Sequence, residues 1–223
     1  MEKLLWCFLV LISLSDVFGQ KDMSKKTFVF PKESDNSYVS LKAQLKKPLN
    51  AFTVCLRFYT DLFTSRGYSI FSYATKKHSN EILIFWSKNR GYILFFLLSL
   101  LVHLGIQYTP VHICASWESV SGIIELWVDG KPQVRKSLQK GHSVGTGAII
   151  ILGQDQDSFG GSFDANQSFV GDIGDVNMWD FVLSPEEISA VYAGGTFSPN
   201  VLDWRSLTSE THGEVFIRPH LWA

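Results

Sequence analysis

Residues 153–167 bring oxygen-bearing side chains together in one short stretch that contains no Lys or Arg. Its three carboxylates are Asp155, Asp157 and Asp164. Such a cluster repels itself unless a cation is present, and calcium takes about six to eight oxygen ligands from carboxylates, amides and carbonyls. The spacing is not that of an EF-hand, because Phe159 and Asn166 occupy the fifth and twelfth positions counted from Asp155. The stretch is therefore either a calcium loop or a polar surface loop with glycine turns.

The composition indicates one domain with a sizeable core. The chain has 223 residues, a net charge of −1 and 14% aromatic residues, and one large β domain of this length is ordinary. The near-zero charge and the lack of a basic patch argue against a nucleic-acid partner. Neither a P-loop, nor a dinucleotide-binding glycine pattern, nor a cluster of zinc ligands occurs in the sequence.

The first 19 residues have the pattern of a secretory signal peptide. Lys3 precedes an apolar run over residues 4–14, and Val17, Phe18 and Gly19 precede a plausible cleavage point. The apolar run is too short to span a membrane. We therefore expect a signal peptide over residues 1–19 and a secreted domain over residues 20–223, in a compartment where calcium is abundant and thiols oxidise.

Two of the three cysteines remain in the mature chain, since Cys7 leaves with the signal peptide. Cys55 and Cys114 both lie in strand-like segments, and an even pair in an oxidising compartment favours a disulfide. The bridge would close a loop of about 60 residues, worth roughly 4 kcal/mol in the chain-entropy model. The alternative is two separate buried thiols.

The rest of the chain is mostly β-strands. Short aromatic and β-branched segments are divided by polar or Gly/Pro-containing turns, and Asp129-Gly130 is a strong hairpin signal. The expected strands cover residues 27–30, 38–41, 52–58, 68–73, 81–86, 111–114, 124–128, 148–152 and 215–217. This pattern predicts an all-β fold, a two-sheet jelly-roll sandwich of the concanavalin or lectin-like kind.

One short helix is expected on the outer face of a sheet. Ser184 can cap it, Pro185 suits the first helical position, and Glu187 completes a capping box. Gly194 and Gly195 end it. Its apolar face comprises Ile188, Val191 and Tyr192.

The octapeptide at residues 112–119, His-Ile-Cys-Ala-Ser-Trp-Glu-Ser, resembles the pentraxin signature His-x-Cys-x-Ser/Thr-Trp-x-Ser/Thr. The resemblance extends through residues 28–34, the acidic loop, residues 168–174 and the C-terminal third. It covers nearly the whole chain, except for about residues 93–109.

The resemblance implies a calcium-dependent pattern-recognition protein of innate immunity, of the acute-phase type. Pentraxins are jelly rolls assembled as ring-shaped homopentamers, with two calcium ions per subunit that hold the phosphate of phosphocholine. Family calcium ligands fall on Asn80, Asp155, the backbone carbonyl of Gln156, Asp157, Asp164 and Gln167. Phe85 matches the apolar wall for the choline group. Asp129 and Tyr192 match the opposite face, which engages the first complement component, and pentraxins also engage Fc-type receptors on phagocytes.

Two ligand positions depart from the family pattern. Ser79 stands where the family has Asp, which removes a negative charge and a strong calcium ligand. Asp155 stands where a longer Glu is usual, which keeps the charge but shortens the reach. We therefore expect one of the two calcium sites to be weakened.

The family's carboxylate and hydroxyl partners for choline fall within residues 93–109, which here contain no acidic residue. Phosphocholine binding should therefore be weakened or shifted toward phosphoethanolamine, phosphorylated sugars or galactose-type sugars. The apolar run over residues 93–106 would span roughly 21 Å as a helix, short of the roughly 30 Å hydrocarbon core, so a buried or interfacial segment is expected. Our hypothesis is a shifted reading frame or a gene model that reads through non-coding sequence. If genuine, the run is an aggregation liability.

Two other functions compete with recognition. A degenerate pentraxin copy would fold or be secreted poorly because of residues 93–109. A jelly-roll glycoside hydrolase would need two carboxylates flanking a sugar bond, and no strand supplies a Glu-x-Asp-x-x-Glu type pair, so we do not expect an enzyme. Asn166 begins an Asn-x-Ser sequon, and a glycan there would crowd the acidic loop.

Overall fold

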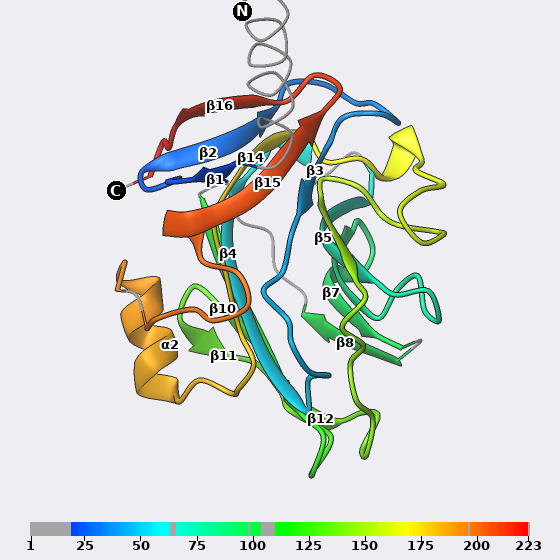
Figure 1. Ribbon diagram of the computed structural model, residues 1–223, viewed down its shortest axis with the longest axis vertical. Coiled ribbons are helices and arrows are strands. Elements are labelled where there is room, and N and C mark those ends of the chain that lie inside the picture. Colours follow the sequence, from blue (N-terminus) through cyan, green and yellow to red (C-terminus); the bar gives the residue numbers. More distant parts are fainter. Residues whose placement is uncertain (1–18, 63–65, 98, 104–109, 196, 223) are drawn as a thin grey trace, which may run out of the picture.

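The computed structural model describes residues 19–62, 66–97, 99–103, 110–195 and 197–222 (Figure 1). Apart from Gly19, the expected signal peptide lies outside the described residues. The described chain forms two antiparallel sheets of eight strands each, packed face to face. The predicted all-β two-sheet sandwich is confirmed.

The first sheet is ordered β1-β15-β3-β13-β5-β6-β7-β8. Its strands are β1 (Gln20–Lys21), β15 (Leu207–His212), β3 (Tyr38–Leu41), β13 (Ile149–Leu152), β5 (Tyr68–Ala74), β6 (Ile82–Ser87), β7 (Gly91–Phe96) and β8 (Ser99–His103). Strands distant in sequence are therefore neighbours in this sheet, and β13 lies between β3 and β5.

The second sheet is ordered β11-β10-β9-β4-β14-β2-β16, and β12 also pairs with β10. Its strands are β11 (Lys131–Pro132), β10 (Ile123–Val128), β9 (Val111–Glu118), β4 (Ala51–Tyr59), β14 (Gly171–Trp179), β2 (Lys26–Phe30), β16 (Phe216–Pro219) and β12 (Lys136–Ser137). Two 3-10 turns, η2 (Ala165–Gln167) and η3 (Trp204–Ser206), and one helix, α2 (Pro185–Tyr192), complete the described elements.

The first part of the apolar run, residues 93–96, belongs to β7, and Ile93, Leu94 and Phe96 are buried. Phe96 packs against Phe52 of the second sheet at a ring-centroid distance of 5.8 Å and against Trp117 at 4.7 Å. Ile93, on the other face of β7, is also buried, with 3% of its surface exposed. A strand buried on both faces needs no polar alternation, which explains the continuous hydrophobic sequence. The expectation of a buried segment is confirmed for these residues, and the frame-shift hypothesis stays a prediction.

The Asp129-Gly130 turn joins β10 to β11 as the sequence predicts. Both residues have positive φ, 49° for Asp129 and 71° for Gly130. Type I′ hairpin turns require this conformation at both central positions, and Asn/Asp-Gly is the pair that tolerates it best.

Helix α2 packs on the outer face of the second sheet, at the lower left of Figure 1. Its capping box is formed, with Ser184 accepting from the Glu187 backbone and Glu187 accepting from the Ser184 backbone. Ile188 and Val191 are buried against the sheet, as expected. The prediction is wrong for Tyr192, the last residue of the helix: 40% of its surface is exposed.

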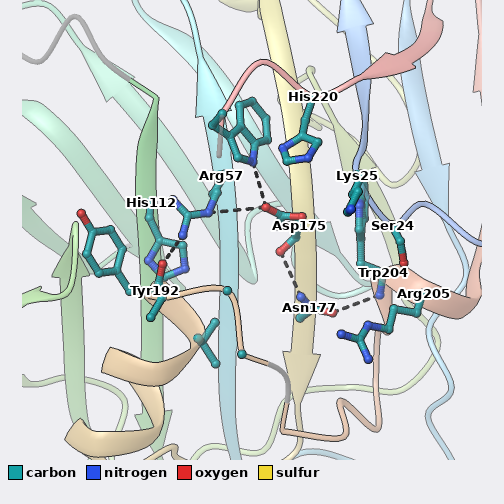
Figure 2. Close-up of a pocket in the computed structure, with 15 residues that line it drawn as sticks. Ser24, Lys25, Arg57, His112, Asp175, Asn177, Tyr192, Trp204, Arg205 and His220 are labelled. Atoms are coloured by element: carbon teal, nitrogen blue, oxygen red, sulfur yellow. Dashed lines mark hydrogen bonds and ion pairs between the residues drawn. The ribbon is translucent and has the colours of Figure 1, made fainter.

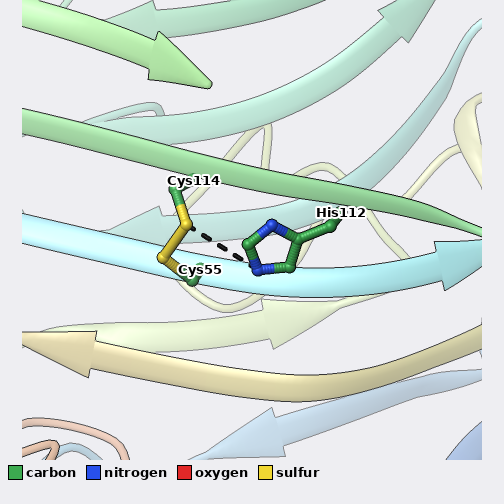
Figure 3. Close-up of side chains that lie close together, drawn as sticks. All are labelled: Cys55, His112 and Cys114. Atoms are coloured by element: carbon green, nitrogen blue, oxygen red, sulfur yellow. Dashed lines mark hydrogen bonds between the residues drawn. A yellow bond between two sulfur atoms is a disulfide. The ribbon is translucent and has the colours of Figure 1, made fainter. Parts of the chain in front are cut away.

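The disulfide joins Cys55 of β4 to Cys114 of β9, which are directly opposite in adjacent strands (Figure 3). The predicted pairing is confirmed. The His112 Nε2 atom lies 3.8 Å from the Cys114 sulfur, and burial, with a smaller contribution from Arg57, lowers the pKa of His112 to about 3. His112 is therefore a neutral packing residue, and this cysteine–histidine cluster is a covalent bridge rather than a metal centre.

Replacing both cysteines, Cys55→Ala with Cys114→Ala, should lower the free energy of unfolding by about 2–5 kcal/mol, because the bridge constrains an unfolded loop between residues 59 apart in sequence. Urea unfolding followed by tryptophan fluorescence measures the change. Reduced wild-type protein should unfold at nearly the same urea concentration as the double variant. This comparison separates loss of the disulfide bond from loss of side-chain volume. Unfolding of the variant at the same urea concentration as oxidised wild type would contradict the prediction.

Candidate functional site

The acidic loop, residues 153–167, leaves the first sheet at the end of β13. Gly153 has φ 86°, and a Cβ atom at this position would lie 2.5 Å from a ring carbon of Phe30. Only glycine therefore suits the exit from the strand. The Phe169 N–H donates to the Gly153 carbonyl at 2.9 Å, which ties the two ends of the loop together.

The loop is held down on the sheet by buried glutamine side chains. The Gln156 Nε2 atom donates to the carbonyls of Ser72 and Ile149, each at 3.1 Å, while its Oε1 atom accepts from Gly160 N at 3.0 Å. Ser69 Oγ donates to the Gln154 carbonyl at 3.0 Å. The loop therefore folds back over β5 and β13. Both polar atoms of the Gln156 side chain make these hydrogen bonds. The backbone carbonyl oxygen of Gln156 is therefore the atom that could bind a metal.

Asp155 is a buried acid in a negative environment. Only 6% of its surface is exposed, and burial, followed by repulsion from Asp157, raises the pKa of Asp155 to about 7. The two predicted ligands are therefore close enough to interact through space. Two carboxylates that repel each other in this way provide the charge that a hard divalent cation neutralises.

Three oxygens of the predicted ligand set are buried without a hydrogen-bond partner. They are Asn80 Oδ1, Asp155 Oδ1 and Gln167 Oε1. Buried polar atoms in folded proteins are usually paired, and each unpaired one costs about 1–3 kcal/mol. Carboxylate and amide oxygens are the donor types that calcium prefers, so the residues present fit a calcium ion.

The C-terminal part of the loop carries two further predicted ligands on one 3-10 turn. Asp164 caps η2, and its Oδ1 atom accepts from Asn166 N at 2.9 Å and from Asn166 Nδ2 at 3.0 Å. Gln167 ends the same turn. The carboxylates of Asp155, Asp157 and Asp164 do not all approach within 4.8 Å of one another, which agrees with their mutual repulsion.

Asn80 and Ser79 lie in the turn between β5 and β6, far from the acidic loop in sequence. The turn follows Ala74, which pairs with Ile149 across the sheet. Because Gln156 reaches back to the Ile149 carbonyl, the acidic loop returns toward this turn. Sheet register therefore brings Asn80 toward the acidic loop, whereas the sequence alone suggested its role only through the family resemblance.

Phe85 stands half-buried on the same face as the acidic loop. It pairs with Ser69 on one side and Ile93 on the other, and Ser69 holds the Gln154 carbonyl. A Cβ atom at Gly67 would lie 2.8 Å from the Phe85 ring, so glycine leaves room for that ring. The residue that β7 places beside Phe85 is the aliphatic Ile93. No acidic residue occurs in the sequence between Glu81 and Glu118.

Asp129 and Tyr192 meet on the second sheet, on the opposite side of the sandwich. Asp129 Oδ1 accepts from His112 N at 2.8 Å, and the Tyr192 ring lies 5.5 Å from the His112 ring. A Cβ atom at Gly130 would lie 2.9 Å from the Tyr192 ring. The structure therefore places both predicted complement-face residues beside His112, within one surface region.

A cleft of 530 Å³ opens next to Tyr192 (Figure 2). Arg57 lies within it, with its Nε atom 3.4 Å from Asp175 and its guanidinium 5.4 Å from the centre of the Tyr192 ring. Trp222 Nε1 donates to Asp175 at 3.0 Å. Arg57, Asp175 and Trp222 could not be predicted from the sequence, because they lie in β4, in β14 and after β16, and their spacing does not reveal that they converge.

The structure is a two-sheet jelly roll with an oxygen-rich loop on the first sheet and a helix on the second. The Pentaxin family model matches residues 26–219, and the chain belongs to this family, also spelled pentraxin. It is 79% identical to C-reactive protein of Cavia porcellus and 67% identical to C-reactive protein of Homo sapiens, in each case over 100% of both chains.

The fold is also that of a solved pentraxin structure. The heptameric SAP-like pentraxin from Limulus polyphemus superposes with a TM-score of 0.74 at 24% sequence identity, covering 88% of this chain and 95% of that chain. Within the part of the chain that the structure describes, no helix has the length and apolar character needed to cross a membrane.

Asp155→Asn should raise the free energy of unfolding in calcium-free buffer by on the order of 1 kcal/mol, because it removes a buried charge that faces Asp157. Asp164→Asn is the matched control. It keeps an oxygen that can accept the two hydrogen bonds at the start of η2, and Asn caps about as well as Asp, so stability should change by less than about 0.5 kcal/mol. Urea unfolding in EDTA measures both. Equal changes of stability in the two variants would contradict the electrostatic interpretation.

Proposed function

We propose that this chain is a secreted, calcium-dependent pattern-recognition protein that binds phosphocholine-type ligands and engages complement and phagocyte receptors. The observation that carries the proposal is the set of three buried oxygens without partners, on Asn80, Asp155 and Gln167. Membership of a family of calcium-dependent binding proteins supports the same function.

Calcium would be held by Asn80, Asp155, the Gln156 carbonyl, Asp157, Asp164 and Gln167. When bound, it supplies the positive charge that grips a phosphate, so the chain needs no Arg or Lys for this purpose. We propose two ions per subunit, one of them bound more weakly because Ser79 offers a hydroxyl where a carboxylate is usual. The Gln156 side chain keeps its own carbonyl in place through its hydrogen bonds to β5 and β13.

The quaternary ammonium of phosphocholine would contact the half-buried Phe85 ring, which lies beside the acidic loop. A ring face attracts such a cation. The neighbouring β7 residue is the aliphatic Ile93 rather than an acid. Without an acidic partner the ammonium gains little charge stabilisation, so we propose weak phosphocholine binding and a relative preference for phosphoethanolamine, or for phosphorylated or galactose-type sugars.

The opposite face would engage the first complement component and Fc-type receptors through Asp129, Tyr192 and the adjoining cleft. The two candidate sites belong to different sheets, so occupation of one face leaves the other accessible. Assembly into a ring-shaped homopentamer would present five copies of each face. Several weak contacts then add up to strong attachment by multivalency.

Secretion forms part of the proposal, with a signal peptide over residues 1–19 and the pentraxin domain over residues 20–223. The Cys55–Cys114 bridge is the type of bond that persists in oxidising compartments. We propose binding rather than catalysis. The burial of Tyr92, Leu94 and Phe96 in the core favours a folded domain over a degenerate copy.

Secreted protein should be retained on immobilised phosphocholine in the presence of calcium and released by chelator, because the phosphate is held through the metal. Phe85→Ala should weaken retention on phosphocholine by roughly fivefold, the equivalent of about 1 kcal/mol, and should change retention on phosphoethanolamine less. Column elution with the two resins measures both effects. Full retention in EDTA would refute the calcium-dependent mechanism.

Ser79→Asp should strengthen the weaker calcium site by at least about tenfold, since it adds a charged oxygen ligand. Ser79→Asn is the control, because an Asn side chain has nearly the same shape as the Asp side chain but carries no charge. Calorimetric titration of calcium-stripped protein resolves the two sites. Two equally tight sites in the wild-type chain would show that Ser79 does not weaken either of them.

A further inference from the structure

A second cluster of potential metal ligands lies on the turn that enters β6, where His78 and Glu81 flank the calcium-ligand positions Ser79 and Asn80. Glu81 is 2% exposed, and its Oε1 atom lies 3.1 Å from His142 Nε2 and accepts from Gly145 N at 3.1 Å. Its other oxygen, Oε2, is buried without a hydrogen-bond partner. A buried carboxylate with one unused oxygen beside an imidazole is a partly satisfied site.

A second imidazole stands next to this pair. His78 is exposed on the same turn, and its ring centre lies 6.3 Å from that of His142 with the ring planes at 79°. Two imidazoles on one tetrahedral zinc, with Zn–N distances of about 2.0 Å, have ring centres about 5 Å apart. The three donor atoms do not all lie within 4.8 Å of one another in the structure. Binding therefore requires rotation of His78, which its exposed position permits.

We propose that His78, His142 and Glu81 form a binding site for Zn²⁺ or a similar transition metal, with water as the remaining ligand. Two imidazole nitrogens and one carboxylate suit zinc, whereas calcium and magnesium prefer oxygen ligands only. None of its three ligands belongs to the proposed calcium set, although His78 and Glu81 directly flank Ser79 and Asn80 in the chain.

The surroundings of the site hold two of the three ligands in place. The His142 ring contacts Phe96 at a centroid distance of 5.9 Å and Trp117 at 6.3 Å. The Gly145 N–H fixes the orientation of the Glu81 carboxylate. Support of this kind orients metal ligands and reduces the entropy lost on binding. The exposed Lys76 and Lys77 precede His78, and their repulsion of a cation is screened by solvent.

A simple histidine–glutamate pair elsewhere in the chain provides the comparison. His212 Nε2 lies 3.7 Å from Glu210 Oε2, and both side chains are about one-third exposed. Its carboxylate is not buried, and the His212 ring stacks on the Tyr38 ring rather than on a second histidine. It should therefore bind zinc no better than an ordinary surface histidine does.

The test uses the secreted full-length chain after passage over a chelating resin. Calorimetric titration with ZnCl₂ should show one site per subunit, and Co²⁺ should produce the visible absorption of tetrahedral coordination. His78→Gln and His142→Gln should each weaken zinc binding by at least about tenfold. His212→Gln should leave it unchanged.

Absence of zinc binding by the wild-type chain, or unchanged binding by His78→Gln, would overturn the proposal. His78→Gln is the decisive variant, because an exposed turn residue can be replaced without loss of the fold, as circular dichroism would verify. Asp155→Asn separates this site from the acidic loop. Loss of zinc binding in that variant would place the metal in the loop and contradict the assignment, whereas loss of calcium binding alone would leave it intact.

Discussion

The central constraint in this molecule is the set of buried oxygens without partners among the candidate calcium ligands. Asn80, Asp155 and Gln167 each have a buried side-chain oxygen that accepts no hydrogen bond. Asp155 is also repelled by the negative charge of Asp157. Such an arrangement opposes folding. It persists because the Gln156 hydrogen bonds and the Phe169–Gly153 contact fix the loop from outside the cluster. The rest of the sandwich supplies the free energy of folding that offsets the cost of these buried oxygens.

Two sheets allow the two surfaces to differ in character. The first sheet carries a loop rich in oxygens, and the second carries α2 over the disulfide. On the helix side two charged groups are compensated locally: Arg57 meets Asp175, and Asp129 accepts from the His112 backbone. That surface suits a protein partner, whose contacts depend on shape and paired polar groups. The loop side, with its uncompensated negative charge, suits a cation.

Much of the fold was predictable from local sequence, because alternation, capping and turn chemistry act over a few residues. The capping box at Ser184 and the turn at Asp129-Gly130 both formed as expected. Strand β14 was not predicted, because its glycines and polar residues interrupt the apolar pattern that is typical of a central strand. The approach of Asn80 to the acidic loop depends on the pairing of Ala74 with Ile149. Register of this kind is set by tertiary structure and leaves no local signal.

The apolar run of β7 shows how one segment can preserve a fold while changing a site. Its inward side chains, including Phe96, join a core that accepts any well-packed apolar residue. Its outward Ile93 pairs with Phe85, where recognition of a cationic group benefits from a carboxylate. Packing constrains the inner face by volume alone, whereas ligand chemistry constrains the outer face by charge. A chain with this run can therefore fold as its relatives do, and the ligand preference proposed above is compatible with that fold.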